Sequence, residues 1–346
     1  MRATVVVVTF DHRDVVVRCL DALRASLGPE DEVVVVDNAS RDGTVEQIAA
    51  THPWVRVERS ARNVGFGAAC NRGARVAAGR HLVFLNPDTE PTPGWLDALL
   101  AGLRAVPDAG LATARLLLPG APARIDAFGN DVHLSGITPS RGWGEPASRY
   151  DALEEVSAAS GACLAISREL FGRLGGFDER LFLYFEDTDL SLRARLAGHR
   201  CVAVPDATVV HDHRPGFSPV KLRYLERNRW WTLLKLYRVR TLLALAPVLG
   251  LSEVVAWGMA AKCGPRHVLA KGRAWAELAR WLPDLPAERA RVQATRAVSD
   301  GQLLRLHATR LPFRQAGDGA LVGAGERMAA AAFAGGRALV AAAGVR

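Results

Sequence analysis

The first part of this sequence has no lysine, and the whole chain has no closely spaced pair of cysteines. Residues 1–213 contain no lysine, and none of the five cysteines in the chain belongs to a CxxC pair. Scattered cysteines of odd number give no indication of a thiolate metal site or a dithiol redox site, and they are typical of buried thiols in a reducing compartment. The start of the chain also lacks a long hydrophobic signal segment with a small-residue cleavage site. We therefore expect the folded domain to remain in the cytoplasm.

Phosphate-binding loops of the common kinds are missing as well. The segment RNVGFGAACNRGAR contains Gly65, Gly67 and Gly73 but fits neither GxGxxG nor GxxxxGK[ST], so neither a dinucleotide fold nor a P-loop NTPase is indicated. Close approach of the backbone to a ligand and tight helix packing would each explain these glycines. The first apolar run, VVVVTFDHRD, contains no glycine. This argues against a sugar-phosphate nucleotidyltransferase, which would carry a glycine-rich phosphate loop there.

Acidic and basic residues are distributed unevenly along the chain. Residues 1–213 have 22 Arg against 28 Asp and Glu, a net charge of −6, whereas residues 214–346 have 22 basic against 8 acidic residues, a net charge of +14. An acidic front half does not suit a nucleic-acid-binding protein. The basic rear half suits an anionic membrane surface or another polyanionic partner, and a solvated basic face is the alternative.

Apolar runs of strand length alternate with helical patterns in the first two hundred residues. Strands are expected at residues 5–9, 33–36 and 81–85, and helices at residues 14–26 and 44–50. Near-continuous apolar runs are typical of parallel strands that are covered on both faces. The alternation predicts a doubly wound α/β sheet, in which ligands bind at the carboxyl ends of the strands. With 346 residues, 49% of them hydrophobic, the chain is long enough for one large domain and an appendage.

Polar residues follow several of the apolar runs. Asp37 ends the second run, Asn86 and Asp88 lie in the NPD turn after the third, and His211 and His213 follow a later one. An acid at a strand end can bind a ribose or a base edge, and a carboxylate at a sharp turn can hold Mg²⁺ or Mn²⁺ on a diphosphate. A helix N-cap, a Pro-Asp turn and structural histidines are the alternative interpretations.

Three carboxylates, Glu186, Asp187 and Asp189, lie within four residues behind the apolar run FLYF. Like charges this close raise one another's pKa, and an apolar flank disfavours ionisation, which favours a functional site. The alternative is that they cap the helix that follows. In that helix Asp189 can pair with Arg193, and Gly198 supplies a C-terminal stop.

Taken in order, these motifs resemble those of the inverting family 2 glycosyltransferases, and most of all their bacterial rhamnosyltransferase-like branch. The resemblance covers roughly residues 3–240, and it rests on Asp37, the RNVGFG segment with Asn71, the NPD turn, the block GGFDERLFLYFEDTDLSLR and His211. It implies a GT-A fold, with a doubly wound, mostly parallel sheet in a nucleotide-sugar-binding catalytic domain of residues 1–215. A basic helical extension, residues 216–346, would follow.

The implied reaction is the transfer of a sugar, rhamnose or a related hexose, from a nucleoside-diphosphate sugar to a hydroxyl of a cell-envelope glycan or a polyprenyl-diphosphate-linked acceptor. A non-catalytic sugar-nucleotide binding module and a nucleotidyltransferase of related architecture are the alternatives. By resemblance Asp37 contacts the uracil or thymine nucleoside, and Asp88 with His211 holds Mg²⁺ or Mn²⁺ on the donor diphosphate. Asn86 stands where many relatives have the first acid of a DxD motif. The donor-binding residues expected are Thr9, Asp11, Asp37, Asn63, Gly65, Asn71, Asn86 and Asp88.

The same resemblance makes Asp187 the general base that takes the proton of the acceptor hydroxyl, with Glu186 raising its proton affinity. Gly161, in the segment SGACLAISR, and Trp143, in the turn-rich segment before it, are expected on the acceptor side, where an aromatic ring can stack on a sugar. A surface loop with an incidentally exposed Trp is the alternative. Asp189 is expected either on the acceptor side or as the cap of the helix.

Residues 242–261 form a stretch of twenty residues with one charge, Glu253, between basic flanks. Its length meets the requirement for a membrane-spanning helix, but Pro247, Gly250 and Glu253 interrupt it. A packed or homo-oligomer-interface helix, an interfacial anchor and a true span are all open. An anchor would dock the protein on the inner face of the cell membrane, where a lipid-linked acceptor lies. The alanine-rich tail from Gly325 onward predicts a further helix.

Overall fold

A computed structural model of the chain describes residues 1–213 and 216–311. The described residues form two compact units. We call residues 1–130, 140–194 and 199–213 the sheet unit, and residues 131–139, 195–198 and 216–311 the helical unit. The boundary expected at residue 215 and the helix expected from Gly325 onward lie outside the described residues.

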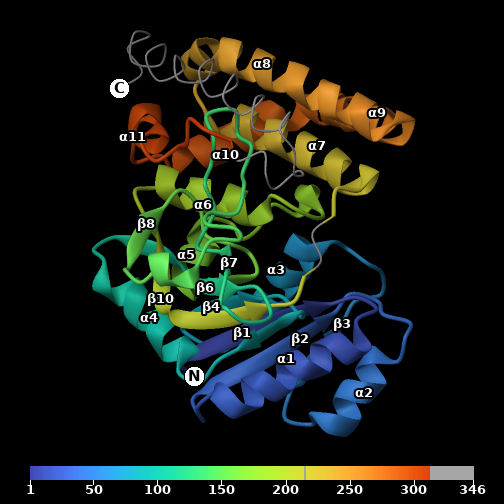
Figure 1. The fold of residues 1–346 in the computed structure, drawn as a ribbon, viewed down its shortest axis with the longest axis vertical. Helices are drawn as coiled ribbons and strands as arrows, with labels where there is room; N and C mark the ends of the chain where they lie inside the picture. Colours follow the sequence, from blue (N-terminus) through green and yellow to red (C-terminus); the bar gives the residue numbers. More distant parts are fainter. Residues whose placement is uncertain (214–215, 312–346) are drawn as a thin grey trace. The chain divides into compact units, whose positions relative to one another are not determined.

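The sheet unit is built on a sheet that has ten strands within the described part of the chain (Figure 1). The strands are hydrogen-bonded in the order β3-β2-β1-β4-β9-β6-β10-β5, with β7 beside β6 and β8 beside β10. Strands β9, β5, β7 and β8 run antiparallel to their neighbours, and the others run parallel to one another. The predicted doubly wound, mostly parallel sheet is therefore confirmed. The strands are β1 Ala3–Thr9, β2 Asp31–Asp37, β3 Arg56–Arg59, β4 His81–Leu85, β5 Thr89–Pro91, β6 Ala109–Leu117, β7 Ile125–Ala127, β8 Glu154–Val156, β9 Cys163–Ser167 and β10 Arg200–His211.

Helices cover both faces of this sheet. They are α1 Arg13–Ser26, α2 Thr44–Thr51, α3 Phe66–Val76, α4 Trp95–Ala105, α5 Arg168–Arg173 and α6 Glu186–Leu196, with short 3-10 turns at Ala147–Arg149 and Glu179–Leu181. Val5 and Val7 of β1 belong to a core that also contains side chains of α1, α2 and α4. Val6, between them, lies against Gly73 of α3 instead. Successive side chains of a strand point to opposite faces, so α3 covers the second face.

The helical unit consists of α7 Pro219–Leu236, α8 Val239–Cys263, α9 Pro265–Trp281, α10 Leu285–Ala294 and α11 Asp300–Leu304, with a 3-10 turn at Leu282–Asp284. Among the described residues α8 is the one helix that is long and apolar enough to cross a membrane, judged by length and composition. Of its most apolar window of 18 residues, 22% is buried.

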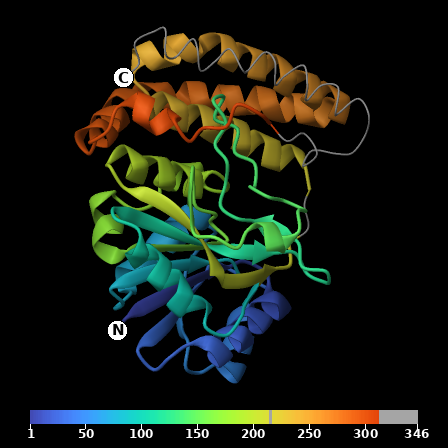
Figure 2. The same cartoon turned by 60° about the vertical axis from the view of Figure 1, so that its left-hand side comes forward.

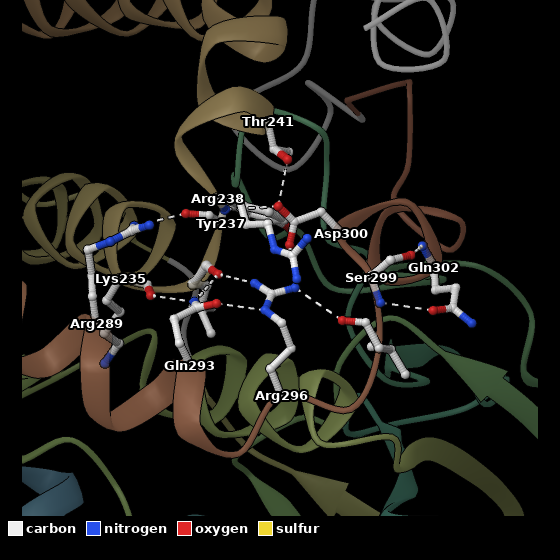
Figure 3. Close-up of polar contacts among 12 residues, drawn as sticks. Lys235, Tyr237, Arg238, Thr241, Arg289, Gln293, Arg296, Ser299, Asp300 and Gln302 are labelled. Carbon is white, nitrogen blue, oxygen red and sulfur yellow. Dashed lines mark hydrogen bonds and ion pairs between the residues drawn. The ribbon is translucent and has the colours of Figure 1, made fainter. Parts of the chain in front are cut away.

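A polar network joins the end of α7 to α8, α10 and α11 (Figure 3). The side-chain amide of Gln293 donates to the carbonyl oxygens of Lys235 and Leu236, at 3.3 and 2.8 Å, and Arg296 donates to that of Leu236 at 2.7 Å. Asp300 accepts from the backbone N–H of Arg238 at 2.8 Å and lies 2.6 Å from Arg296. The last carbonyl groups of a helix have no partner within it. This network supplies such partners and fixes the turn between α7 and α8.

Candidate active site

The carboxyl ends of β1, β2 and β4 bring three expected donor-binding residues to one edge of the sheet. Thr9 and Asp37 are paired across β1 and β2, and Asn86 follows β4, which pairs with the other side of β1. Thr9 and Asp37 are each 1% exposed. The hydroxyl of Thr9 has no hydrogen-bond partner among the described residues. The carboxylate of Asp37 accepts from the backbone N–H of Ser40 at 3.2 and 3.3 Å, so it holds the turn after β2.

Asp11 ties the loop after β1 to the loop after β2. Its carboxylate accepts from the backbone N–H of Arg41 at 2.7 Å, and its own N–H donates to the hydroxyl of Ser40 at 2.9 Å. Asp11 has a φ of 52°, a left-handed conformation that aspartate tolerates better than most residues. The side chain is exposed at the strand-end edge.

Asn63 and Gly65 form a tight turn before α3. The side-chain oxygen of Asn63 accepts from the backbone N–H of Gly65 and from the amide of Asn38, both at 2.9 Å. The next N–H, that of Phe66, donates to the carbonyl of Phe182 at 2.6 Å. A Cβ on Gly65 would lie 2.4 Å from this carbonyl oxygen, and the φ of Gly65 is +89°. Glycine is therefore required here because two backbone segments of the protein approach closely.

The other glycines of this segment also follow from packing. A Cβ on Gly73 would lie 2.4 Å from the Cγ1 atom of Val6, and one on Gly67 would lie 3.1 Å from the Cβ atom of Phe177. Of the two explanations left open by the sequence, tight packing accounts for these positions.

The side chain of Asn71 is hydrogen-bonded inside the protein. Its side-chain oxygen accepts from the backbone N–H of Phe177 at 2.9 Å, and its amide donates to the carbonyl of the same residue at 2.9 Å and to Glu179 at 3.0 Å. With both ends of the amide bound to the segment before α6 and 8% of the residue exposed, Asn71 holds that segment. Asn71 can therefore contribute to the expected donor binding only indirectly, by holding this segment in place.

Asp88 and His211 are brought together by the pairing of β5 with β10. His211 lies opposite Thr89 in this pair, and the backbone N–H of Asp212 donates to the carbonyl of Asp88 at 2.9 Å. The Nε2 atom of His211 lies 3.3 Å from Oδ1 of Asp88. Both atoms are buried without a well-aligned hydrogen bond among the described residues, which is the arrangement expected of two ligands that face a shared cation.

Two further residues, Asp126 and His213, complete a group that the sequence interpretation of the metal site did not include. Oδ2 of Asp126 lies 2.8 Å from Nδ1 of His211, and Oδ1 lies 3.4 Å from Nδ1 of His213. The two imidazole rings are stacked with their centroids 4.6 Å apart. Asp126, His211 and His213 form a candidate metal-binding group. An acid between the buried apolar residues Ile125 and Ala127 of β7 was the signal for Asp126.

The charges of this group determine the protonation of its members. Burial alone would lower the pKa of His211, but hydrogen bonds and the charges of Asp126 and Asp88 raise it to about 9. Burial alone would raise the pKa of Asp88, and its interaction with His211 more than offsets this and lowers it. The bound proton is thus held by carboxylates on both sides, as a divalent cation would be.

Asp187 is held at the start of α6 by four hydrogen bonds. Its Oδ2 atom accepts from the backbone N–H of Gly161 at 2.8 Å and from the amide of Asn130 at 3.3 Å. Its Oδ1 atom accepts from the N–H and the hydroxyl of Thr188, at 2.6 and 3.3 Å. Burial raises the pKa of Asp187, and these hydrogen bonds act in the opposite direction. They favour the ionised form of Asp187 against the effect of its burial.

Glu186 has the opposite environment. It is 8% exposed, and its Oε2 atom is buried without a hydrogen-bond partner among the described residues. Burial, followed by the charge of Asp187, raises the pKa of Glu186 to about 8. Burial is therefore the main cause of the raised pKa of both carboxylates, and the charge of Asp187 raises the pKa of Glu186 further. We expected Glu186 to raise the proton affinity of Asp187, and the largest cause of the raised pKa of Asp187 is its burial.

The backbone that leads into α6 is strained. Phe182, Tyr184 and Phe185 have φ values of 62°, 64° and 76°. Non-glycine residues rarely adopt this region, and such strain clusters at functional sites. The strained turn, which Phe66 holds through the carbonyl of Phe182, presents Glu186 and Asp187 at the first turn of the helix.

Asp189 is neither a helix cap nor exposed to an acceptor. It lies inside α6, is 0% exposed and binds the guanidinium of Arg193 one turn later at 2.8 Å. Arg193 in turn donates to the carbonyls of Leu174 and Gly176, at 2.7 and 2.8 Å. The expected pair with Arg193 is present, and the burial of Asp189 in it favours neither of the two roles expected from the sequence. Its burial in this ion pair makes it a support for the loop before α6.

Gly161 and Trp143 lie in different surroundings. Gly161 donates its N–H to Asp187, and a Cβ there would lie 3.1 Å from the Cβ atom of Asp187. Trp143 is half-buried in the turn-rich segment before β8. Gly161 thus positions the carboxylate directly, whereas the structure shows no contact between Trp143 and the other site residues among those it describes.

The strand-end edge and the carboxylate of α6 are linked through two neighbouring residues. The backbone N–H of Asn86 donates to the carbonyl of Ala162 at 3.0 Å, and the adjacent Gly161 donates to Asp187. The pairing of Leu85 with Cys163 across β4 and β9 sets this register. Residues 161–162 therefore hold Asp187 beside the NPD turn.

Two solved structures with a bound nucleotide sugar share this fold. TarS 1–349 from S. aureus in complex with UDP-GlcNAc superposes with a TM-score of 0.56 at 17% identity, covering 85% of this chain and 89% of that one. The mannosyltransferase PcManGT from Pyrobaculum calidifontis, in complex with GDP-Man and Mn²⁺, gives a TM-score of 0.50 at 21% identity over 99% and 86% of the two chains. At these identities the likeness concerns the fold, which is the GT-A fold.

Sequence comparisons identify the family. The model "Glycosyl transferase family 2" matches residues 4–175. The chain is also 32% identical over 277 residues to the N-acetylglucosaminyl-diphospho-decaprenol L-rhamnosyltransferase of Mycobacterium tuberculosis (strain H37Rv), covering 70% of this chain and 90% of that protein. The chain therefore belongs to glycosyltransferase family 2, and it is a glycosyltransferase similar to the rhamnosyltransferase branch. This membership argues against a non-catalytic binding module and a nucleotidyltransferase.

Proposed function

We propose that this glycosyltransferase acts with inversion, moving a sugar from a nucleoside-diphosphate sugar to a hydroxyl of a cell-envelope glycan or a polyprenyl-diphosphate-linked acceptor. The observation that carries the proposal is the contact of residues 161–162 with both Asp187 and Asn86. It holds a buried carboxylate beside the edge of the sheet where Thr9, Asp37 and the NPD turn meet.

Asp187 is the general base in this proposal. Inverting transfer requires a carboxylate that accepts the proton of the acceptor hydroxyl while its oxygen attacks the anomeric carbon. The hydrogen bonds from Gly161 and Asn130 orient Asp187, and its burial raises its pKa and with it its proton affinity. Protonated Glu186 adds no second charge beside it. Thr9, Asp11 and Asp37 would bind the nucleoside of the donor, with Asn63, Gly65 and Asn71 supporting the loops around it.

Asp88 and His211 would hold Mg²⁺ or Mn²⁺ in this proposal. These two facing atoms, 3.3 Å apart and without a well-aligned hydrogen bond, fit a cation that prefers oxygen and imidazole ligands. When bound, the cation would stabilise the charge that develops on the departing diphosphate. Asp126 would accept a hydrogen bond from Nδ1 of His211 and leave Nε2 to face the cation.

The donor and the acceptor are proposed from the relatives. The mycobacterial relative is named for transfer of L-rhamnose to N-acetylglucosaminyl-diphospho-decaprenol, which supports rhamnose, or a related hexose, and a lipid-linked acceptor for this chain. We place the donor and acceptor chemistry in residues 1–215, with Trp143 on the acceptor side. We assign membrane docking or homo-oligomer formation to the basic extension, residues 216–346. The protein would then work in the cytoplasm, peripherally on the inner face of the cell membrane.

A thermal-shift panel of sugar nucleotides, with and without Mn²⁺, tests the donor. A nucleotide present at about 100 times its Kd stabilises the folded protein by ~2.7 kcal/mol. We expect one uridine or thymidine diphosphate sugar to raise Tm selectively, and more strongly with Mn²⁺. Incubation with that donor and a polyprenyl-diphosphate-linked acceptor should give a product of inverted anomeric configuration by NMR. Retention of configuration, or no stabilisation by any sugar nucleotide, would refute the proposal.

A further inference from the structure

Helix α8 has an outward face without a charge between its two ends. The exposed positions recur with helical spacing, and Leu243 and Val254 on this face are 68% and 70% exposed. A surface helix normally turns polar residues to solvent. An extended apolar face that remains exposed marks a contact surface. Between the terminal cations Arg240 and Lys262, the exposed positions are Leu243, Ala246, Pro247, Gly250, Val254, Trp257, Gly258 and Ala261.

The one charge of α8 between Arg240 and Lys262 points into the helical unit. Glu253 accepts from the guanidinium of Arg229 at 2.5 Å and from the indole N–H of Trp230 at 2.7 Å. The ammonium group of Lys271, which is 0% exposed, lies 3.0 Å from Glu253 and also contacts Glu226. Insertion of α8 across a membrane would break this buried cluster and leave charges unpaired, at a cost of several kcal/mol. The outer face of α8 is therefore available while its inner face stays packed.

Helix α9 also exposes apolar side chains. It lies beside α8 in both views (Figures 1 and 2) and exposes three large apolar side chains, Val268, Leu269 and Trp275, by 37%, 55% and 37%. Arg266, Arg273 and Arg280 follow one another at intervals of seven residues. Because seven residues make nearly two helical turns, these arginines form a stripe along one side of α9.

Acidic residues are few in α8 and α9, and those present are already paired. Between residues 238 and 281 the acids are Glu253 and Glu277, and Glu277 is paired with Arg223 and with Arg227, the latter at 2.9 Å. Six exposed cations have no ion-pair partner among the described residues: Arg238, Arg240, Lys262, Arg266, Arg273 and Arg280.

The arginine stripe also borders a hollow. Its volume is about 330 Å³, and its lining consists of Arg223, Arg273, Ala276, Glu277 and Arg280. Three guanidinium groups against one carboxylate, which is already paired with Arg223, leave an excess of positive charge suited to a phosphate group.

We propose that the outer faces of α8 and α9 form a docking surface for an anionic lipid bilayer. The apolar side chains would enter the boundary between headgroups and acyl chains, and the six cations would contact lipid phosphates. A second copy of the same face fits poorly, because two surfaces with unpaired cations and no exposed acid repel each other. A bilayer supplies both the apolar layer and the negative charge.

Vesicle co-sedimentation of the full chain tests this surface, without donor or acceptor, so its result does not depend on the proposed reaction. We expect binding to phosphatidylcholine vesicles that contain phosphatidylglycerol, weaker binding to phosphatidylcholine alone, and loss of the difference at high salt. At about fivefold per cation near the surface, the triple change Arg266→Gln, Arg273→Gln and Arg280→Gln should weaken anionic-vesicle binding ~100-fold. Leu243→Glu with Val254→Glu should abolish binding to both vesicle types.

Matched controls lie in the sheet unit. Arg24→Gln with Arg104→Gln removes exposed cations, and Trp54→Glu changes an apolar side chain that is 40% exposed. Neither control should alter vesicle binding, and an unchanged Tm will show that each variant is folded. Unaltered binding after Leu243→Glu with Val254→Glu would overturn the proposal. A dimer in solution that these two changes dissociate would assign the face to a second copy. A monomer that binds neither vesicle type would contradict membrane docking, as would such a dimer.

Discussion

Replacement of Glu186 by glutamine tests whether this side chain is protonated at neutral pH. Burial and then the charge of Asp187 raise the pKa of Glu186 from 4.5 to about 8. At 1.36 kcal/mol for each pKa unit, this difference corresponds to ~5 kcal/mol. Glutamine has the shape and charge of the protonated acid, so it should replace Glu186 with little change below the pH at which the carboxyl group of the unfolded chain ionises.

The sign of the effect follows from the direction of the shift. Because the folded-state pKa of Glu186 lies above its unfolded value, the folded protein binds this proton more tightly. The stability that Glu186 contributes is fully present below about pH 4.5 and is lost as the pH rises through about 8. The free energy of unfolding of the wild type should therefore fall relative to that of Glu186→Gln over this window, by up to ~5 kcal/mol.

Urea denaturation of both proteins at a series of pH values measures this difference in the free energy of unfolding. The contributions of groups that titrate alike in both proteins cancel in the difference. Glu30→Gln, which changes an exposed glutamate in the sheet unit, is the matched control and should give a flat difference. Transfer activity near neutral pH should be retained in Glu186→Gln. A flat difference for Glu186→Gln, or one that grows as the pH falls, would show that Glu186 is ionised in the folded protein and refute the reasoning.

Three further changes test other parts of the site. Asp187→Asn should lower kcat by about 10²- to 10⁴-fold and leave the donor-induced Tm shift intact, and simultaneous loss of that shift would make Asp187 a structural residue instead. Asp126→Asn should weaken Mn²⁺ binding in titration calorimetry by about 10- to 100-fold, and unchanged affinity would exclude Asp126 as the support of His211. Gly65→Ala should lower the free energy of unfolding by ~1–3 kcal/mol, because a Cβ would meet the carbonyl of Phe182 in a left-handed conformation, and wild-type stability in urea would contradict this close approach.

Local patterns determined the framework of the site. The valine runs of β1 and β2 predicted buried parallel strands, and the polar residues after the runs predicted an edge with Asp37 and Asn86, to which the family resemblance added Thr9. These inferences succeed because hydrophobic periodicity and turn chemistry act over a few neighbouring residues. The same holds for the pair of Asp189 and Arg193, which lie one helical turn apart.

Contacts between distant segments were not visible in these patterns. Asp126 reaches His211 across 85 positions of the chain, and Gly161 reaches Asp187 across 26. Asn71 was expected to bind the donor, yet its amide is fully engaged by the segment before α6. A polar residue in a motif has the same sequence signal whether its partner is a ligand or another part of the chain.

The sequence alone determined the α/β class, the family, the order of the strand-end motifs and the basic character of the rear half, because each of these is written in local periodicity, composition or motif order. Only the tertiary structure decided which carboxylate of the acidic triplet is hydrogen-bonded, which is neutral and which is locked in an ion pair. It also turned Glu253 inward and left the apolar face of α8 outside. Burial and charge partners set these outcomes, and both depend on segments that meet only when the chain has folded.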